Sequence, residues 1–250
     1  MAGCPAGLSS RGCFRPVSVP PMAVAQPRDG DAAAEPVAVG VRAVYDAVAG
    51  AYDAALRDEL DGKPLDRALL TAFAELAVCG PLADVGCGPG HVTRFLAARH
   101  PHVIGIDLSP AMVAIARQRT PELTFTVGSM LRLPVDDGAW AGAVALYSII
   151  HLTGQDRRTA WRELSRALRP GGWLLVAFHI DSAEFEAGQV NHLRNWFGRS
   201  IELDGFFLDP AQVVAELQSA DFALVAQLQR QPSPGVEYPS RRGYLLAQRL

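Results

Sequence analysis

Hydrophobic positions along this chain change repeatedly between two periods. Apolar residues spaced three and four apart predict helices, whereas short continuous apolar runs predict strands that are buried on both faces. By this pattern, residues 41–60 and 64–77 form two helices ahead of the first strand. Strands are then expected at 81–86, 102–107, 123–128, 139–148, 172–180, 222–229 and 243–249, and helices at 91–100, 109–119, 155–168 and 209–220.

The alternation of strands and helices predicts an α/β fold, with a doubly wound, mostly parallel sheet covered by helices on both faces. Ligands of such sheets bind beyond the carboxyl ends of the strands. We expect residues 41–250 to form one domain of this kind. Residues 181–209 interrupt the alternation as a longer irregular stretch, which is typical of a lid or a binding loop.

The N-terminal residues 1–40 differ from the rest, because they are rich in Ala, Pro and Gly and show no sustained period. We interpret them as a disordered tail. Two alternatives stay open. The first 28 residues hold three arginines and no acid, as in an organelle transit peptide, and the reading frame could instead be overlong, with its working start at Met22.

Composition narrows the classes of partner. The chain has 250 residues, 49% of them hydrophobic, and a formal net charge of −3, so it has no basic field to attract nucleic acid. No apolar run approaches the roughly 20 residues that cross a bilayer, so we expect no membrane partner. The four cysteines show no metal-ligand spacing and indicate reduced thiols in the cytoplasm. The oligomeric state is left open.

The segment ADVGCGPG, residues 83–90, carries the clearest chemical signal. It places Gly86, Gly88 and Gly90 at alternate positions between a strand and a helix. Glycine permits positive φ and removes the Cβ that would hold a ligand away from the backbone. A tight turn needs only one such residue, so three indicate a loop built for close approach of a ligand.

Two carboxylates limit the class of ligand that the loop can bind. Asp84 precedes the loop, where it would repel a phosphate and attract an ammonium, and Asp107 ends the next strand, where it would accept two ribose hydroxyls. A dinucleotide loop has the spacing G-x-G-x-x-G, but His91 occupies the position of its last glycine. A ligand with an amino-acid end and an adenosine end therefore fits better than NAD.

The chain resembles the class I S-adenosylmethionine-dependent methyltransferases over roughly residues 41–250. The segments that carry the resemblance are LADVGCGPG (82–90), VIGIDLSPAMVAIAR (103–117), GSMLRLPVDDGAWAGAVALYSIIHL (128–152) and LRPGGWLLVAFH (168–179). The resemblance implies a Rossmann-like seven-stranded sheet whose last strand is antiparallel. It also implies that S-adenosyl-L-methionine is the methyl donor and S-adenosyl-L-homocysteine the product.

The resemblance further implies roles for individual residues. The three loop glycines would pass under the methionine part, Asp84 would hold its ammonium and Asp107 the ribose. The adenine and sulfonium would contact Leu108, Met112, Ser129, Met130, Leu146 and Tyr147. Position 129 departs from the family, which usually has an acid there; the neutral hydroxyl of Ser129 should form a weaker hydrogen bond.

Transfer to a protonated nucleophile needs a base. His151, in YSIIHL after the strand at 139–148, has a pKa suited to that role, although a packing or loop-orienting histidine is the alternative. His179, at the end of the strand at 172–180, is a second candidate. Tyr45 and Tyr52 are seven residues apart on one face of the first helix. We expect Tyr45 to contact the cofactor and place Tyr52 with the acceptor.

The acceptor is expected to be a small molecule. No motif for nucleic-acid methylation is present, which disfavours nucleic acid, and protein substrates stay open. Within residues 181–209, His192, Trp196, Phe206 and Phe207 are candidates for an apolar acceptor pocket, or for a hydrophobic cluster under a loop. Arg241 and Arg242 are interpreted as a solvated basic turn. Two other functions stay open: a nicotinamide-dependent oxidoreductase, and a module that binds S-adenosylmethionine without catalysis.

Overall fold

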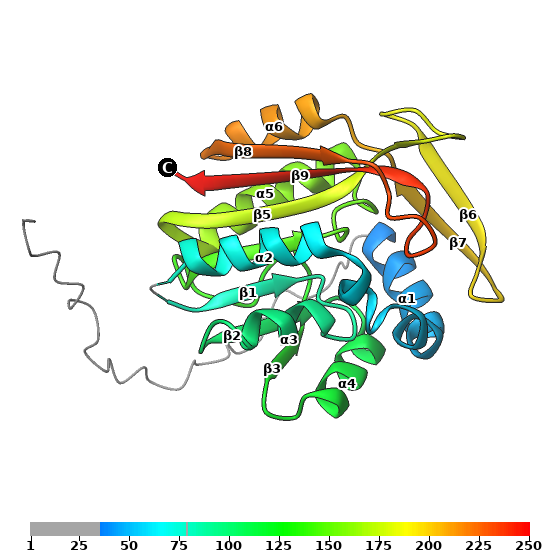
Figure 1. The fold of residues 1–250 in the computed structure, drawn as a ribbon, viewed down its shortest axis with the longest axis horizontal. Coiled ribbons are helices and arrows are strands. Elements are labelled where there is room, and N and C mark those ends of the chain that lie inside the picture. The colour runs from blue at the N-terminus through cyan, green and yellow to red at the C-terminus, as the bar shows by residue number, and fades with distance from the viewer. Residues whose placement is uncertain (1–35, 79) are drawn as a thin grey trace, which may run out of the picture.

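The computed structural model describes residues 36–78 and 80–250, and its centre is a seven-stranded sheet of order β3-β2-β1-β4-β5-β9-β8 (Figure 1). Its strands are β1 (Leu82–Val85), β2 (Val103–Asp107), β3 (Thr124–Val127), β4 (Trp140–Leu146), β5 (Leu168–Ser182), β8 (Phe222–Arg230) and β9 (Ser240–Arg249). Neighbours from β3 to β5 pair in parallel. The last strand, β9, runs antiparallel to β5 and β8, which confirms the predicted fold class.

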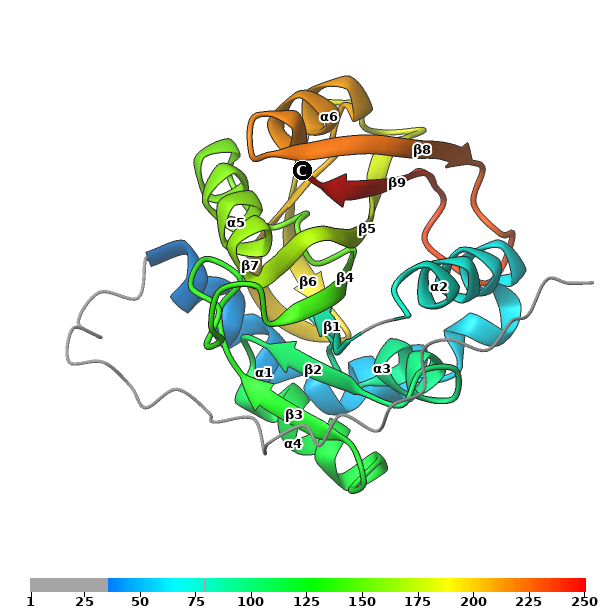
Figure 2. The ribbon, with the colours of Figure 1, turned by 90° about the vertical axis from the view of Figure 1, so that its left-hand side faces the viewer.

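Helices cover both faces of this sheet (Figure 2). They are α1 (Pro36–Leu56), α2 (Pro64–Leu76), α3 (His91–Ala97), α4 (Pro110–Arg119), α5 (Gly154–Ala167) and α6 (Pro210–Gln218), with a short 3₁₀ turn at Glu59–Gly62. Successive residues of a strand face opposite sides of the sheet and pack in different hydrophobic cores. Leu82 packs with α2 and α3, whereas Ala83 packs with α5 and α6. Both faces of the strands are therefore buried, which explains their unbroken apolar runs.

Capping residues fix where several helices begin. The Ser109 hydroxyl accepts from the Met112 backbone N–H at 3.1 Å, and the Asp209 carboxylate accepts from the Ala211 N–H at 3.0 Å. Proline follows each cap, because the first helical position needs no backbone donor. The α4 cap, Ser109, lies two residues after Asp107, so this local sequence sets the geometry at the end of β2.

The first helix begins at Pro36, earlier than the boundary of 41 expected from the sequence. The rest of the predicted tail, residues 1–35, lies outside the described residues, as does Cys79. Cys87 is buried and free. Within the two described ranges no helix is both long enough and apolar enough to cross a bilayer.

The stretch 181–209 is not the irregular insertion that the sequence suggested. It contains an antiparallel hairpin of β6 (Val190–Trp196) and β7 (Arg199–Phe206), which forms a sheet of its own. The hairpin packs on α1 through Val44, Ile201 and Leu203. Figure 1 shows the hairpin and α1 together at the edge where the parallel strands end.

Candidate active site

The glycine loop after β1 needs two of its glycines to pack. Gly86 has φ +80°, and a Cβ there would lie 2.2 Å from the Ser148 Cβ. Gly90 has φ +85°, and its Cβ would lie 2.9 Å from the Phe125 ring. Gly88 is different: it has φ +52°, and a Cβ would meet only the Tyr52 ring at 3.8 Å. Gly88 thus leaves open the space that a ligand could enter.

Asp107 holds the loop in place. Its Oδ2 accepts from the Gly88 N–H at 2.8 Å and its Oδ1 accepts from the Ser109 N–H at 2.8 Å. Burial raises the pKa of this carboxyl, although these backbone hydrogen bonds oppose the effect. Each carboxylate oxygen still has a lone pair, so Asp107 can accept further hydrogen bonds from a ligand.

Asp84, at the other side of the loop, is only 2% exposed. The Thr93 hydroxyl donates to its Oδ2 at 2.6 Å. Burial raises the pKa of Asp84 to about 6, despite the hydrogen bond from Thr93 and the attraction of His91. A buried carboxylate with a raised pKa favours a cation beside it, because a cation offsets the cost of burying the charge.

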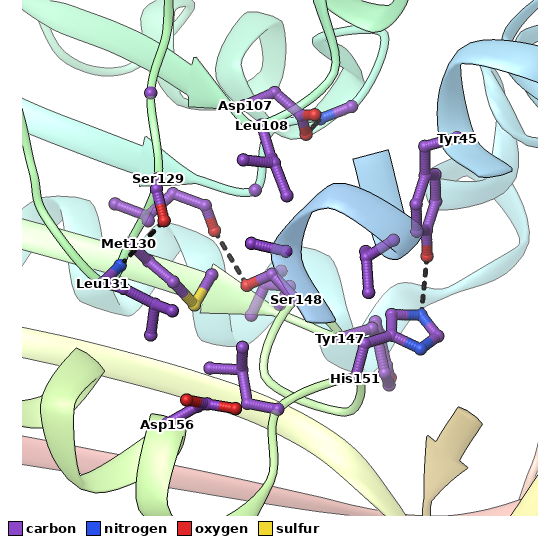
Figure 3. A pocket seen from close by; sticks show the side chains of 18 of the residues that line it. Tyr45, Asp107, Leu108, Ser129, Met130, Leu131, Tyr147, Ser148, His151 and Asp156 are labelled. Carbon is purple, nitrogen blue, oxygen red and sulfur yellow. Dashed lines mark hydrogen bonds between the residues drawn. The ribbon is translucent and has the colours of Figure 1, made fainter. Parts of the chain in front are cut away.

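A cavity of about 100 Å³ lies beyond these strand ends, and we call it the loop cavity (Figure 3). The predicted residues that line it are Tyr45, Tyr52, Gly86, Gly88, Asp107, Leu108, Ser129, Met130, Leu146, Tyr147 and His151. Segments more than a hundred residues apart in sequence thus meet here, as the resemblance implied. Sequence reasoning missed Ser148 and Asp156, which also line the cavity. Ser148 lies within the segment 128–152 but was given no role, and Asp156 lies in none of the segments that carry the resemblance.

Three of the residues predicted to contact the cofactor do not line the loop cavity. Gly90 packs against Phe125, and Met112 is fully buried below the start of α4. Asp84 lines a smaller cavity nearby together with Gly86, Gly88 and His91. Their proposed contacts with a ligand stay predictions, whereas their packing positions are fixed by the fold.

A second cavity, of about 230 Å³, adjoins the first, and we call it the aromatic cavity. Its ring-bearing lining residues are Tyr45, Tyr52, Tyr147, His151, His179, Trp196, Phe206, Phe207 and Tyr238. Four of these, Tyr45, Tyr52, Tyr147 and His151, also line the loop cavity. The two cavities therefore share a wall, and a ligand in one lies beside a ligand in the other.

Tyr147 stands at this shared wall in a strained backbone conformation, with φ +56°. Its N–H donates to the Ala177 carbonyl at 2.8 Å, and its hydroxyl lies 2.9 Å from the Tyr244 hydroxyl. The Tyr244 hydroxyl donates to Asp66 at 2.8 Å. This chain of contacts fixes the ring between the two cavities.

His151 is held by partners on both ring nitrogens. Its Nδ1 lies 2.6 Å from the Asp204 carbonyl oxygen in β7, and its Nε2 lies 2.8 Å from the Tyr45 hydroxyl in α1. A carbonyl only accepts, so Nδ1 carries the proton and Nε2 accepts from Tyr45. Burial lowers the pKa of His151, although the contact with Asp204 opposes this. The imidazole is therefore neutral and joins α1 to the hairpin.

His179 has a different set of partners. The Arg242 Nη1 donates to its Nδ1 at 2.7 Å, and the Ser240 hydroxyl lies 2.6 Å from the same nitrogen. Burial and the charge of Arg242 lower the pKa of His179 to about 3. The expectation of a solvated basic turn is wrong for Arg242, which is 2% exposed and lines the aromatic cavity. Arg241 is partly exposed and pairs with Asp181.

Sequence reasoning missed the charged groups of the aromatic cavity. Lys63 lies 2.5 Å from Glu59 and 3.3 Å from Glu237, and Arg242 lies 3.2 Å from Glu237. Burial alone would raise the pKa of Glu59, but the hydrogen bond and charge of His91 and the charge of Lys63 lower it to about 2. These residues come from segments with no common motif, so only the fold brings them together.

The two remaining candidates of the hairpin, Trp196 and His192, lie in different surroundings. Trp196 packs edge-to-face on Tyr45 and Tyr52, with ring centroids 5.5 and 5.7 Å apart, and lines the aromatic cavity. His192 instead faces outward, with its side chain 71% exposed and its Nδ1 2.5 Å from the Asp204 carboxylate. His192 lines neither of the two adjoining cavities.

Comparison with known proteins gives a family match from β1 to the start of β5, which includes the glycine loop. Residues 82–172 match the model of a methyltransferase domain. The match includes the glycine loop, Asp107 and His151, but it excludes α1 and the hairpin, which form much of the aromatic cavity.

Curated relatives match over part of their length. A trans-aconitate 2-methyltransferase of Methylobacterium nodulans is 38% identical over 112 residues, which are 43% of this chain and 41% of that protein. The chain spans between 38% and 45% of the length of the first curated relatives that it matches.

Solved structures share the fold more completely. The 1,6-didemethyltoxoflavin-N1-methyltransferase of Burkholderia thailandensis, solved with its substrate and S-adenosylhomocysteine, has a TM-score of 0.65 at 19% identity and covers 85% of this chain and 88% of its own. The [4+2]-cyclase SpnF has a TM-score of 0.63 at 21% identity, covering 84% and 94%. The sheet order, the glycine loop and the match of residues 82–172 to a methyltransferase domain support a class I S-adenosylmethionine-dependent methyltransferase.

Proposed function

We propose that this chain transfers a methyl group from S-adenosylmethionine to a small-molecule acceptor, with the methyl donor in the loop cavity and the acceptor in the aromatic cavity. The observation that carries the proposal is that four residues line both cavities, so the two cavities adjoin. Methyl transfer is a direct displacement, and it needs the donor and the acceptor in adjoining positions. The family match at residues 82–172 supports the same reaction.

The loop cavity and the smaller cavity beside it, which Asp84 lines, together fit the two ends of the donor. Gly88 leaves room for close approach of a ligand, Asp107 keeps lone pairs for the ribose hydroxyls, and buried Asp84 would hold the ammonium. Gly86 and Gly90 would shape the loop. The adenine would lie among Leu108, Ser129 and Met130 and above buried Met112, with Leu146 and Tyr147 towards the sulfonium.

Ser129 would contact the adenine less strongly than an acid would. Its hydroxyl already accepts from the Leu131 N–H at 3.2 Å, and it carries no charge. We therefore expect this contact to position the adenine, and expect the glycine loop and the two aspartates to supply most of the binding free energy.

The donor, once bound, supplies an already activated methyl group on a sulfonium. The protein has to align the acceptor with it and exclude water. Tyr45 in α1 and Trp196 in the hairpin close the aromatic cavity, while Tyr52 and His179 line its walls. His151 would act as the base, and exposed His192 would contact only an acceptor that extends past the hairpin.

We further propose that residues 41–250 act as a single cytoplasmic domain, with the hairpin region 181–209 as the acceptor-binding insertion. The net charge of −3 supports a small molecule over nucleic acid as the partner. Among the described residues, no group of three or more His, Cys, Asp and Glu side chains is placed to hold a metal ion.

Thermal unfolding with added ligands tests the cofactor. A ligand at about a hundred times its dissociation constant stabilises the folded state by roughly 2.7 kcal/mol. For a domain of this size the midpoint should rise by about 5–10 °C. We expect this rise with S-adenosylhomocysteine and with S-adenosylmethionine, and no rise with NAD. A rise with NAD alone would instead support a nicotinamide-dependent enzyme and refute the proposed donor site.

A further inference from the structure

The two histidines of the aromatic cavity, His151 and His179, carry their ring protons on different nitrogens. The guanidinium of Arg242 can only donate, so its contact of 2.7 Å with the His179 Nδ1 leaves the ring proton on Nε2. Nε2 has no hydrogen-bond partner among the described residues, and His179 is part of the cavity wall. His179 therefore offers an N–H donor to whatever occupies the cavity.

His151 has the reverse arrangement. Its Nδ1–H is used by the Asp204 carbonyl at 2.6 Å, so Nε2 presents a lone pair. The Tyr45 hydroxyl occupies that lone pair at 2.8 Å and itself lines the cavity. The pair of Tyr45 and His151 can therefore take a proton from a hydroxyl, with the phenol passing its own proton to Nε2. One cavity thus holds a site that accepts a proton and a separate site that donates a hydrogen bond.

Aromatic rings form most of the remaining wall. Tyr45, Tyr52 and Trp196 contact one another edge-to-face, with centroid distances from 5.5 to 5.9 Å. Phe206 and Phe207 lie on the same cavity. Rings in a wall favour a flat aromatic ligand, because such a ligand gains stacking and edge-to-face contacts beyond its buried area.

The charges in the wall of the aromatic cavity are paired and sum to zero. The ionisable cations are Lys63 and Arg242, the anions are Glu59 and Glu237, and each cation has a carboxylate within 3.3 Å. Burial alone would raise the pKa of Glu237, but its contacts with Arg230 and the Ser233 N–H lower it to about 2, so the acid stays ionised. A charged ligand would have to break one of these pairs, whereas a neutral one would not.

We propose that the acceptor is an uncharged aromatic compound that carries a hydroxyl and a separate carbonyl oxygen. This inference rests on the proposed function. The hydroxyl lies at Tyr45 and His151 and is the nucleophile: its O–H bond breaks, the proton ends on the His151 Nε2, the new O–CH₃ bond forms, and the C–S bond of the donor breaks. The carbonyl accepts from the His179 Nε2–H and sets the orientation of the ring.

Calorimetric titration with two-ring probes tests this assignment without turnover. The probes are the hydroxytetralone isomers, tetralone without the hydroxyl, tetrahydronaphthol without the carbonyl, and hydroxynaphthoates as charged counterparts. Each is titrated with and without saturating S-adenosylhomocysteine. We expect at least one hydroxytetralone to bind about 3- to 10-fold more tightly than either truncated probe, since each loses one hydrogen bond, and expect the naphthoates to bind more weakly still.

Two variants at one position give the sharper readout. His179→Phe should abolish the preference for hydroxytetralone over tetrahydronaphthol while leaving tetrahydronaphthol affinity within about twofold. His179→Gln, which keeps an N–H donor, should retain part of the preference. A preference that persists in His179→Phe, or tighter binding of the naphthoates to the native protein, would overturn the inference. The second result decides the matter even if the variant does not fold.

The same titrations separate this inference from the proposed function. If S-adenosylhomocysteine does not bind, the proposed donor site is wrong, and the ranking of probes without it still decides what the aromatic cavity recognises. If S-adenosylhomocysteine binds and the probes show no ranking, the acceptor assignment alone fails.

Discussion

Replacing Asp84 by asparagine should make the protein more stable and abolish most of its cofactor binding. The carboxylate is 2% exposed, and burial raises its pKa from 3.8 to about 6. Above pH 6 the charged form therefore costs the folded state about 3 kcal/mol relative to the unfolded chain. Asparagine has the same shape without the charge, so the unliganded Asp84→Asn variant should unfold about 2–10 °C higher at pH 7.5.

The gain should depend on pH in a defined direction. Because the folded-state pKa lies above the unfolded value, the native protein itself gains stability as the pH falls from about 6 to 4. The difference between Asp84→Asn and the native protein should therefore shrink over that window. Calorimetry at several pH values measures it.

The same substitution should lower the affinity for the cofactor, although it raises the stability of the protein. An ammonium beside a buried carboxylate makes a charge-assisted contact, so Asp84→Asn should bind S-adenosylhomocysteine about 10- to 100-fold more weakly. Thr93→Val is the matched control, because it keeps the charge and removes only the hydroxyl that donates to Asp84 at 2.6 Å. That variant should be less stable than the native protein. Unchanged binding in Asp84→Asn would show that this carboxylate does not hold the ligand.

Loss of His151 should have the largest effect on turnover. His151 is buried and neutral, and its Nε2 lone pair is directed at Tyr45 in the wall between the two cavities (Figure 3). A positioned base contributes about 10²–10⁴ to a rate. His151→Gln should therefore lower kcat by about 10²-fold or more with little change in KM, when measured with any acceptor found by methyl labelling.

Two comparisons separate a base from a packing residue. The His151→Gln variant should recover rate as the pH rises, because a hydroxyl acceptor ionises without help. Tyr45→Phe should lose less, about tenfold, since it removes the relay but keeps the imidazole. If the rate of His151→Gln stays within about threefold of the native rate at all pH values, His151 only joins α1 to the hairpin through Asp204.

The parts of the site that depend on local sequence could be predicted. Asp84, Asp107 and the glycines stand at strand ends, where the chain pattern alone fixes their place at the carboxyl edge of the sheet. The individual roles given to these residues remain predictions. The sequence therefore predicts where these residues lie in the fold, because a strand followed by a helix leaves few geometries for the turn between them.

The aromatic cavity could not be predicted to the same depth. Lys63 lies just before α2, Glu237 lies in the loop before β9, and Arg242 lies in β9. These three residues meet only through tertiary packing. The hairpin was missed because β6 shows no clean alternation of apolar and polar residues. In β7 only Ile201 and Leu203 alternate with exposed polar residues, which is a short signal on its own. Its turn has positive φ at Phe197 and Gly198, as two-residue hairpin turns require, but phenylalanine is unusual at that place.

Incubation with trideuteriomethyl-labelled S-adenosylmethionine and a broad metabolite extract, followed by mass spectrometry, tests the central claim most directly. We predict a product that carries one labelled methyl group on oxygen, formed together with S-adenosylhomocysteine and strongly reduced with Asp84→Asn at donor concentrations that only the native protein binds. Tight binding of S-adenosylhomocysteine with no labelled product from any extract would contradict the claim. The chain would then be a binding module, or an enzyme for a different reaction on the same fold.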